Sequence, residues 1–489
     1  MNSENIGAWI NPLFHKNDGY QTPVVIEPFR ESGNIDVNRQ EELAIQRLLS
    51  NLLEVESTEE GDDDINSSLR YLKPGIKATS ISLDKEFEAP RKEDDFYRIF
   101  SINAPKKGRA SLDLEVLFEE FNVEGVDTDI KYDDDDIMDV AKVYIIKKLS
   151  IITQRYSKYQ KYSILHYNLR GKKPRLKTLA SRLRNDTSHV TYKLRQAINF
   201  LKYGLYRNNL HENFNIESLS KKIALKMGEE KGSKIDFFLP PSFFKVSIYL
   251  GEEAKFGFSS LSSGEKQKIY AMYSILYHIK NIDSVYEWDI GTLKYGYVNI
   301  LLDEVELCFH PELQRSFIYD LLLLLGKRDL QYVNGVNICF VTHSPFILSD
   351  IPSENILFLD KASDLSPSLP VLKSKKTFSA NIHELLSAGF FMKRTIGEYS
   401  EKCILDILSI YQDVKENGKT YSNYSTYKSE RKKINYIFDS IADNEIKGII
   451  RNHLKFIETE LGFENHVDLE IKQLENRIKL LREMGENHA

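Results

Sequence analysis

The stretch that decides the fold is VNILLDE at residues 298–304. Apart from Asn299 it is apolar through Leu302, and it ends in two carboxylates, Asp303 and Glu304. A run that is apolar on both faces is typical of a strand in a parallel sheet covered by helices. The carboxyl edge of such a sheet is where ligand sites form in α/β proteins. Taken alone, the same ending is a strand terminated by solvated acids.

The run ILFL at residues 356–359 is also apolar on both faces and is predicted to be another strand of this sheet. Two further segments carry candidate site residues. The run ICFVTHSP at residues 338–345 places His343 directly after another buried strand. Upstream, LSSGEKQ at residues 261–267 precedes a predicted helix that extends through about Lys280. Free N–H groups at a helix start suit a phosphate, and Gly264 has no Cβ to block a close approach. Alone, the histidine is an ordinary loop residue and the Ser-Ser-Gly an ordinary N-cap.

In this order the three segments resemble the C-terminal half of an ABC-type ATPase, with its signature loop, Walker B strand and switch histidine. Glu265 after the glycine, together with DEVELCFHPE at residues 303–312, resembles the SMC, RecF and OLD-like branch rather than transporters. The similarity covers residues 235–360. Weaker similarity, in RESGNIDVNR at 30–39 and ANIHELL at 380–386, is to bacterial phage-defence ATPases of the PtuA type.

The resemblance implies ATP and Mg²⁺ as cofactors and gives three residues a chemical role. Asp303 would bind Mg²⁺, Glu304 would act as the general base and His343 would sense the terminal phosphate. The implied function is an ATP-binding and ATP-hydrolysing module acting in DNA or RNA transactions, such as phage defence or repair.

The resemblance also implies a dimer, formed with a second copy or with a different chain through the nucleotide interface. In such a dimer the signature loop grips a nucleotide that is bound to the opposing subunit. The gripping residues would be Ser262, Ser263 and Gly264. Ser263 stands where the family usually has glycine, a difference that a short side chain can tolerate.

A Walker A loop, G-x-x-x-x-G-K-[ST], is missing from the 489 residues. The nearest stretches, RGKK at 170–173 and GEEKGSK at 228–234, lack the spacing that wraps backbone amides around phosphates. Three explanations stay open: a shortened version of a longer ATPase, a partner chain that supplies the loop, or a degenerate ATPase that only binds. We expect the polypeptide alone to hydrolyse ATP poorly.

A second class of function competes with the ATPase: a non-hydrolysing scaffold that binds a nuclease partner. An OLD-type nuclease would need a further carboxylate module after the histidine loop, and residues 396–489 contain no Asp-x-Asp pair. Two features are not typical of a transporter subunit. One is Glu265 in the signature loop, and the other is the long, predicted helical segment inserted before the three motifs.

Basic residues concentrate between residues 147 and 207, where 16 Lys and Arg stand against one acidic residue, Asp186. Interleaved tyrosines add possible stacking surfaces for bases. The residues predicted to contact nucleic acid are Arg170, Lys172, Lys173 and Arg175. The alternative is an exposed helical arm whose charges only solvate it.

The composition of the chain restricts its class and its cellular location. The chain is 42% hydrophobic and 28% charged, with a net charge of −6. It has no apolar run of about 18 residues and no signal-peptide pattern, so we expect a cytoplasmic protein without a membrane partner. The three cysteines form no CxxC pair for zinc. Four aspartates at 133–136 precede a long apolar-periodic stretch and suit a helix start.

The predicted fold class is α/β: an ABC-ATPase-like, mostly parallel sheet covered by helices, with a basic helical insertion and a helical C-terminal region. Four regions follow. Residues 1–130 are a mixed N-terminal region, residues 131–234 the basic insertion, residues 235–395 the lobe with the three motifs, and residues 396–489 the helical end.

Overall fold

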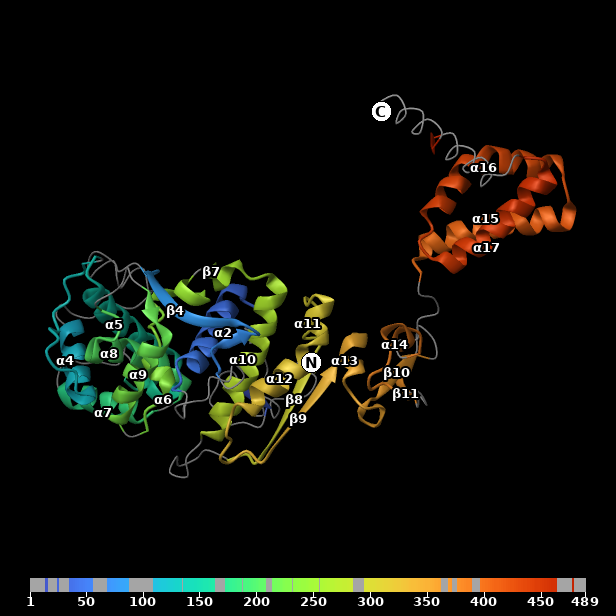
Figure 1. The fold of residues 1–489 in the computed structure, drawn as a ribbon. Helices are drawn as coiled ribbons and strands as arrows, with labels where there is room; N and C mark the ends of the chain where they lie inside the picture. The colour runs from blue at the N-terminus through green and yellow to red at the C-terminus, as the bar shows by residue number, and fades with distance from the viewer. Residues whose placement is uncertain are drawn as a thin grey trace, which may run out of the picture. The chain divides into compact units, whose positions relative to one another are not determined.

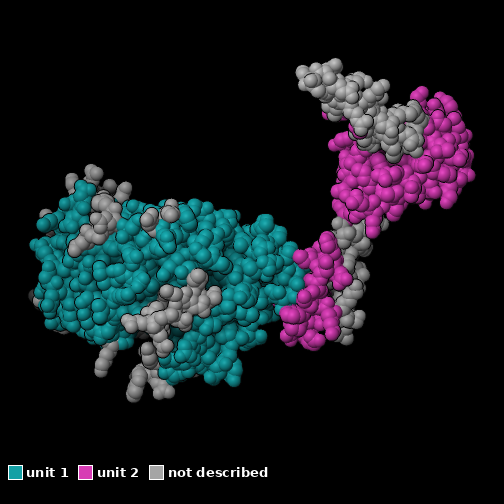
Figure 2. Space-filling view, viewed as in Figure 1, with its two compact units in different colours: residues 1–350 teal, residues 351–489 magenta. Residues whose placement is uncertain are grey.

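The chain forms two compact units, residues 1–350 and 351–489 (Figure 2). None of the predicted domain boundaries, at residues 130, 234 and 395, coincides with the division after residue 350, and these boundaries stay predictions. The computed structural model describes residues 14–15, 24–25, 35–55, 68–87, 109–133, 135–162, 172–186, 188–207, 213–230, 232–254, 256–284, 294–361, 368–371, 376–388, 396–463 and 477–478.

The largest sheet in the described part of the first unit is antiparallel, with strand order β3-β4-β6-β7 and β5 beside β4. Strands β4 and β6 make most of it, paired from Lys85↔Phe244 to Ala78↔Leu250. The mixed α/β class is confirmed, but this sheet is not the mostly parallel one that the sequence predicts. The strands are β3 (Tyr71–Lys73), β4 (Ile76–Lys85), β5 (Phe214–Asn215), β6 (Phe244–Leu250) and β7 (Phe256–Gly257).

Two long helices pack together beside this sheet, α2 (Val37–Leu52) and α10 (Ser263–Asp283). Their apolar residues recur at helical spacing, as the sequence predicts, and the inward ones are fully buried. The Asn51 amide also donates a hydrogen bond to the carbonyl of Tyr273, 3.3 Å away. The buried residues of this pair include Leu48, Leu49, Leu52, Ile269, Met272 and Leu276.

The basic segment folds into a packed helical bundle (Figure 1). Asp136 caps α5, the helix that begins at Ile137, by accepting a 2.9 Å hydrogen bond from the Met138 N–H. This confirms the aspartate run as a helix start. Tyr159 and Tyr206 are buried inside the bundle and so cannot stack on bases. The helices of the basic segment are α5 (Ile137–Arg155), α6 (Ser157–Gln160), α7 (Lys172–Asn185), α8 (His189–Tyr203) and α9 (Ile216–Gly228). The helix α4 (Arg109–Phe121), which precedes the segment in the chain, packs against α5 and α7.

The motif-bearing strands form a separate parallel pair, β8 (Tyr297–Asp303) and β9 (Gly335–Val341). Their side chains alternate between exposed and half-buried, and the Leu301 side chain is 68% exposed. The prediction of strands buried on both faces is therefore wrong for this pair. Three short helices follow the strands: α11 (Pro311–Arg315), α12 (Phe317–Gly326) and α13 (Pro345–Ser349).

The second unit begins with an antiparallel hairpin, β10 (Phe358–Lys361) and β11 (Ser368–Val371), followed by α14 (Ile382–Ala388). The sequence places the apolar run at 356–359 in the parallel sheet, and this prediction is wrong, because β10 pairs with β11 instead. The predicted C-terminal helical region is confirmed over α15 (Glu398–Asn417), α16 (Tyr421–Ser440) and α17 (Asn444–Leu461), which share one apolar core. Among the described residues, no helix has both the length and the apolar content needed to cross a bilayer.

A buried carboxylate links two helices of this core. Glu458 on α17 is 1% exposed, and it accepts hydrogen bonds from the Tyr427 hydroxyl at 3.1 Å and from Arg431 Nη2 at 2.9 Å. A buried charge without a cationic partner is costly. We therefore expect Arg431→Met to lower the free energy of unfolding by about 2–3 kcal/mol, measured by chemical denaturation.

Lys432→Met is the matched control, since Lys432 is an exposed neighbour on the same helix. It should change the free energy of unfolding by less than about 0.5 kcal/mol. Equal effects of the two substitutions would show that the Arg431–Glu458 pair does not stabilise this unit.

Candidate nucleotide site

The register of β8 and β9 brings the predicted catalytic residues to one edge. Asp303 is paired with Val341 at the carboxyl ends of the two strands. The Glu304 N–H then continues the ladder with a 2.8 Å hydrogen bond to the Val341 carbonyl. Because His343 follows Val341 by two residues, both carboxylates and the imidazole lie at the same end of the parallel pair.

Glu304 has an uncommon backbone conformation, with φ at 47° in the left-handed region. For a residue other than glycine this costs about 1–3 kcal/mol, and such strain gathers at functional sites. Its Oε1 lies 3.4 Å from Nε2 of His343. The His343 side chain is 82% exposed and that of Glu304 is 36% exposed, so both face solvent at this edge.

A polar network beneath the edge holds the histidine loop in place. Glu306 is 4% exposed, and its carboxylate accepts a hydrogen bond from the Thr342 hydroxyl. The Thr342 oxygen in turn accepts the Ser344 N–H at 2.9 Å, and the Ser344 hydroxyl bonds the Gln314 side-chain oxygen at 2.6 Å. These residues fix the loop that carries His343 to the segment after Glu304. The sequence motif at 303–312 contains Glu306 but does not indicate this role.

The start of α10 is closed by its own side chains. Ser262 and Glu265 form a capping box, in which the Glu265 carboxylate accepts both the N–H and the hydroxyl of Ser262, at 2.9 and 2.8 Å. Lys73 donates to the same carboxylate at 2.6 Å. The Lys73 contact, followed by the Ser262 hydrogen bonds, lowers the pKa of Glu265 to about 2. Sequence reasoning missed both Lys73 and the engagement of the Ser262 hydroxyl.

The start of α10 also lies against the segment that follows Glu304. A Cβ placed on Gly264 would stand 2.6 Å from the Cys308 carbonyl oxygen, so only glycine allows this approach. One turn further along, Lys268 donates to the Ser316 hydroxyl and to Asp320 Oδ2, both at 2.6 Å. The predicted gripping residues are therefore fixed relative to the segment that follows the strand end. Among the described residues, no hydrogen bond or ion pair joins them to Asp303 or His343.

Asp303 is suitable for a magnesium ion that shares its coordination with phosphates. Mg²⁺ binds hard oxygen ligands and keeps several waters, so one or two carboxylates plus phosphate oxygens are sufficient. Asp303 is exposed at the strand end, with its carboxylate accessible to such an ion. Across the described ranges, no three His, Cys, Asp or Glu side chains gather into a complete metal site.

The predicted nucleic-acid residues are only partly described. Arg170 lies outside the described residues. Lys172, Lys173 and Arg175 form the first turn of α7, and their side chains also lie outside the described part of the chain. Their contact with nucleic acid therefore stays a prediction.

Comparisons with known proteins do not place the chain in a family. It matches no protein-family model and no curated protein. The likeness to ABC-type ATPases therefore depends on the sequence motifs and on the positions of their residues in the structure.

The contact at Gly264 leads to a test of the site's packing. Alanine is favoured over glycine in a helix by about 1 kcal/mol, but here its methyl group would collide with a backbone carbonyl. Overpacking of this kind costs about 1–3 kcal/mol. We expect Gly264→Ala to lower the free energy of unfolding of the first unit in chemical denaturation.

The matched control is Gly448→Ala in α17, where nothing lies within 4 Å of the added methyl group. There the substitution should stabilise the second unit by about 0.5–1 kcal/mol. If Gly264→Ala were equally stabilising, the close approach of α10 to Cys308 would be refuted.

The Lys73–Glu265 contact predicts a pH dependence. Because the folded pKa of Glu265, about 2, lies below its ordinary 4.5, this carboxylate stabilises the fold above pH 4.5 and ceases to do so as the pH falls toward 2. Lys73→Met should move the Glu265 titration midpoint upward toward 4.5, measured by carbon NMR of labelled glutamate carboxyls. Lys266→Met removes a half-buried lysine of the same helix that donates to the Ser259 carbonyl at 3.2 Å rather than to Glu265, and it should leave the midpoint in place. An unchanged midpoint in Lys73→Met would disprove the contact.

Proposed function

We propose that the chain is the signature and Walker B part of an ABC-type ATPase of the SMC, RecF and OLD-like branch. In this proposal it binds and hydrolyses ATP with Mg²⁺ and acts in DNA or RNA transactions such as phage defence or repair. The observation that carries the proposal is the meeting of Asp303, Glu304 and His343 at one strand edge, with 3.4 Å between Glu304 Oε1 and His343 Nε2.

Each residue at the edge has a chemical role in the proposal. Asp303 holds Mg²⁺, which when bound neutralises charge on the phosphates. Glu304, whose carboxylate faces solvent, orients and polarises the attacking water. His343 donates to the terminal phosphate from a loop that Glu306 keeps in position. The short distance between Glu304 and His343 suits these roles, because the attacking water that Glu304 would orient lies next to the terminal phosphate that His343 would contact.

The phosphate cradle, in this proposal, comes from outside the 489 residues. Strands of parallel sheets are ordinarily covered on both faces, yet Leu301 and Val341 are exposed on β8 and β9. A lobe that carries a Walker A strand would cover this face and complete the site. The same arrangement requires a homodimer or heterodimer, in which Ser262, Ser263 and Gly264 face a nucleotide held by the other subunit.

A scaffold that binds a nuclease partner without hydrolysis is the second candidate. The observation that favours it is the capping of α10, since the Glu265 carboxylate already occupies the Ser262 N–H and hydroxyl. A phosphate could bind Ser262 only by displacing the Glu265 carboxylate or by lying close to its negative charge, which would repel it.

The substitution Glu304→Gln separates the two candidates. The chain is purified from its host together with its bound partners, and steady-state phosphate release is measured. We expect Glu304→Gln to lower turnover by about 10²-fold or more while ATP binding is retained. Glu312→Gln is the matched control, because Glu312 is a nearby exposed carboxylate paired with Arg315. It should leave turnover unchanged.

Two results would contradict the proposal. Turnover unaffected by Glu304→Gln would remove the general base and favour the scaffold. Robust, Glu304-dependent turnover by the isolated polypeptide would show that no external phosphate cradle is needed.

A further inference from the structure

A solvent-open cavity of about 590 Å³ lies along α7, apart from the candidate nucleotide site. We propose that it binds the phosphate backbone of a nucleic acid. This inference names a surface for the nucleic-acid partner of the proposed function, but its test measures binding alone and does not depend on ATP chemistry. The lining consists of Lys158, Lys177, Thr178, Ser181, Arg182 and Asn185, together with the carboxylates Glu120 and Asp186.

Helical spacing explains why the side of the cavity formed by α7 is lined by donors. Thr178, Ser181, Arg182 and Asn185 recur at intervals of three or four residues and therefore share one face of α7. The other face is apolar and buried, which turns the polar face toward solvent. Hydroxyl, amide and guanidinium groups are the side chains that most often contact phosphate oxygens in nucleic-acid complexes. The buried residues are Leu176, Leu179, Ala180 and Leu183.

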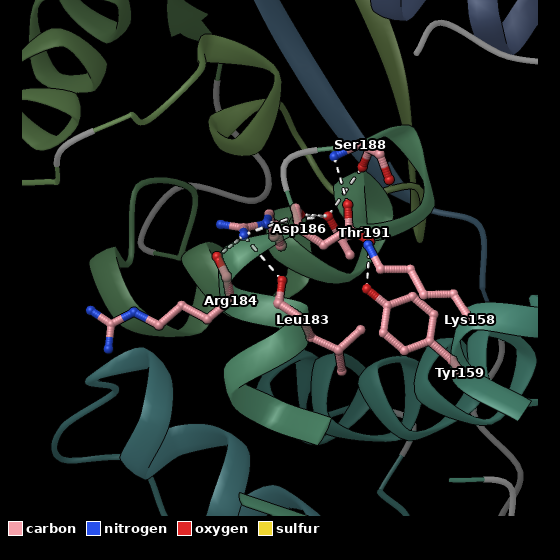
Figure 3. Close-up of polar contacts among 8 residues, drawn as sticks. Lys158, Tyr159, Leu183, Arg184, Asp186, Ser188 and Thr191 are labelled. Atoms are coloured by element: carbon pink, nitrogen blue, oxygen red, sulfur yellow. Dashed lines mark hydrogen bonds and ion pairs between the residues drawn. The ribbon is translucent and has the colours of Figure 1, made fainter. Parts of the chain in front are cut away.

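The end of the cavity is held rigid by a buried carboxylate (Figure 3). Asp186 accepts hydrogen bonds from the Tyr159 hydroxyl, from the Ser188 N–H at 2.9 Å and from Lys158 Nζ at 3.1 Å. Burial alone would raise the pKa of Asp186, but hydrogen bonds from Ser188, Tyr159 and Lys158 outweigh it and hold the pKa below the usual value. The Lys158 side chain is nevertheless 60% exposed and has three N–H donors, so it can also face an anion.

A buried cation, Arg195, also fixes the end of α7. Arg195 donates to the carbonyls of Leu183 at 3.1 Å and of Asp186 at 3.2 Å, and it also bonds that of Arg184. Carbonyls in the last turn of a helix have no partner within the helix, and Arg195 supplies one here. The Asp186 carbonyl also accepts a hydrogen bond from the Thr191 hydroxyl at 2.6 Å. The donors on the solvent face of α7 are therefore presented by a helix whose end is locked, which reduces the entropy lost on binding.

The charge balance along α7 favours an anionic partner. The helix carries six basic residues and no acidic one. Two carboxylates of α4 lie opposite, with Glu119 Oε2 3.3 Å from Lys177 Nζ and Glu120 Oε1 3.9 Å from Arg184 Nη1. The Lys177–Glu119 pair is solvent-exposed on both sides, whereas Glu120 is half-buried. Exposed pairs contribute only about 0–1 kcal/mol, so a phosphate can replace Glu119 at Lys177. Arg182 lies 5.7 Å from the ring centre of Tyr162 and stays exposed.

The length of the donor row indicates a polymer rather than a single phosphate ion. Thr178 to Asn185 spans about 10 Å along the helix axis, at about 1.5 Å per residue. Duplex DNA presents one charge per about 1.7 Å of axis, so several phosphates face a row of this length. Tyr159 and Tyr162 are buried and offer no stacking platform, so the expected contact is with the backbone and independent of base sequence.

Charge reversal on α7 tests the proposal. Labelled single-stranded and duplex DNA and RNA of random sequence are titrated with the full chain, and anisotropy is followed over a range of NaCl concentrations. We expect Lys177→Glu with Arg182→Glu to weaken binding about tenfold or more and to reduce the salt slope by about 1–2. The control reverses Lys221 and Lys222, two exposed lysines of α9, and should keep the wild-type salt slope.

A second variant, Lys177→Gln with Arg182→Gln, gives the same direction of change if the reversed pair fails to fold. Competition with inorganic phosphate at constant ionic strength distinguishes a polymer site from a single-ion site. Equal affinity and salt slope in wild-type and α7 variants would overturn the proposal, as would an equal loss in the α9 control. Displacement of the labelled strand by millimolar phosphate alone would also overturn it.

Discussion

The parallel, in-register pairing of β8 with β9 is the constraint on which the candidate site depends. It sets Asp303 against Val341, and the hydrogen bond from the Glu304 N–H to the Val341 carbonyl extends it by one residue. A one-residue slip would turn every side chain to the opposite face of its strand and separate the carboxylates from the histidine. The strained backbone of Glu304 is held in place by this ladder.

Around the pair, buried polar contacts convert the strand edge into a fixed arrangement. Glu306 and Gln314 hold the histidine loop, and Lys268 joins α10 to the segment that follows Glu304. Gly264 allows the backbone of α10 to approach Cys308. These contacts fix the start of α10, the end of β8 and the histidine loop relative to one another. The Leu301 side chain, by contrast, is exposed on the face of the strand pair that the proposed lobe would cover.

The sequence predicts the local elements well where a single signal decides them. Apolar runs ending in DE and THSP predict β8 and β9, and the Ser-Ser-Gly at 262–264 predicts the start of α10. It fails where tertiary pairing decides. An apolar run such as that at 356–359 does not reveal that β10 pairs with β11, and interleaved tyrosines do not reveal that Tyr159 is buried against Asp186. Long-range contacts such as Lys73 to Glu265 leave no trace in spacing.

We propose that the edge formed by Asp303, Glu304 and His343 receives a metal-bound triphosphate. The most direct measurement is an anomalous difference map from crystals of the chain grown with Mn²⁺ and a non-hydrolysable ATP analogue, at concentrations high enough to offset weak binding. The account predicts a manganese peak in contact with an Asp303 carboxylate oxygen and a terminal phosphate facing His343. A metal–nucleotide complex bound elsewhere on the chain, with none at Asp303, would contradict it.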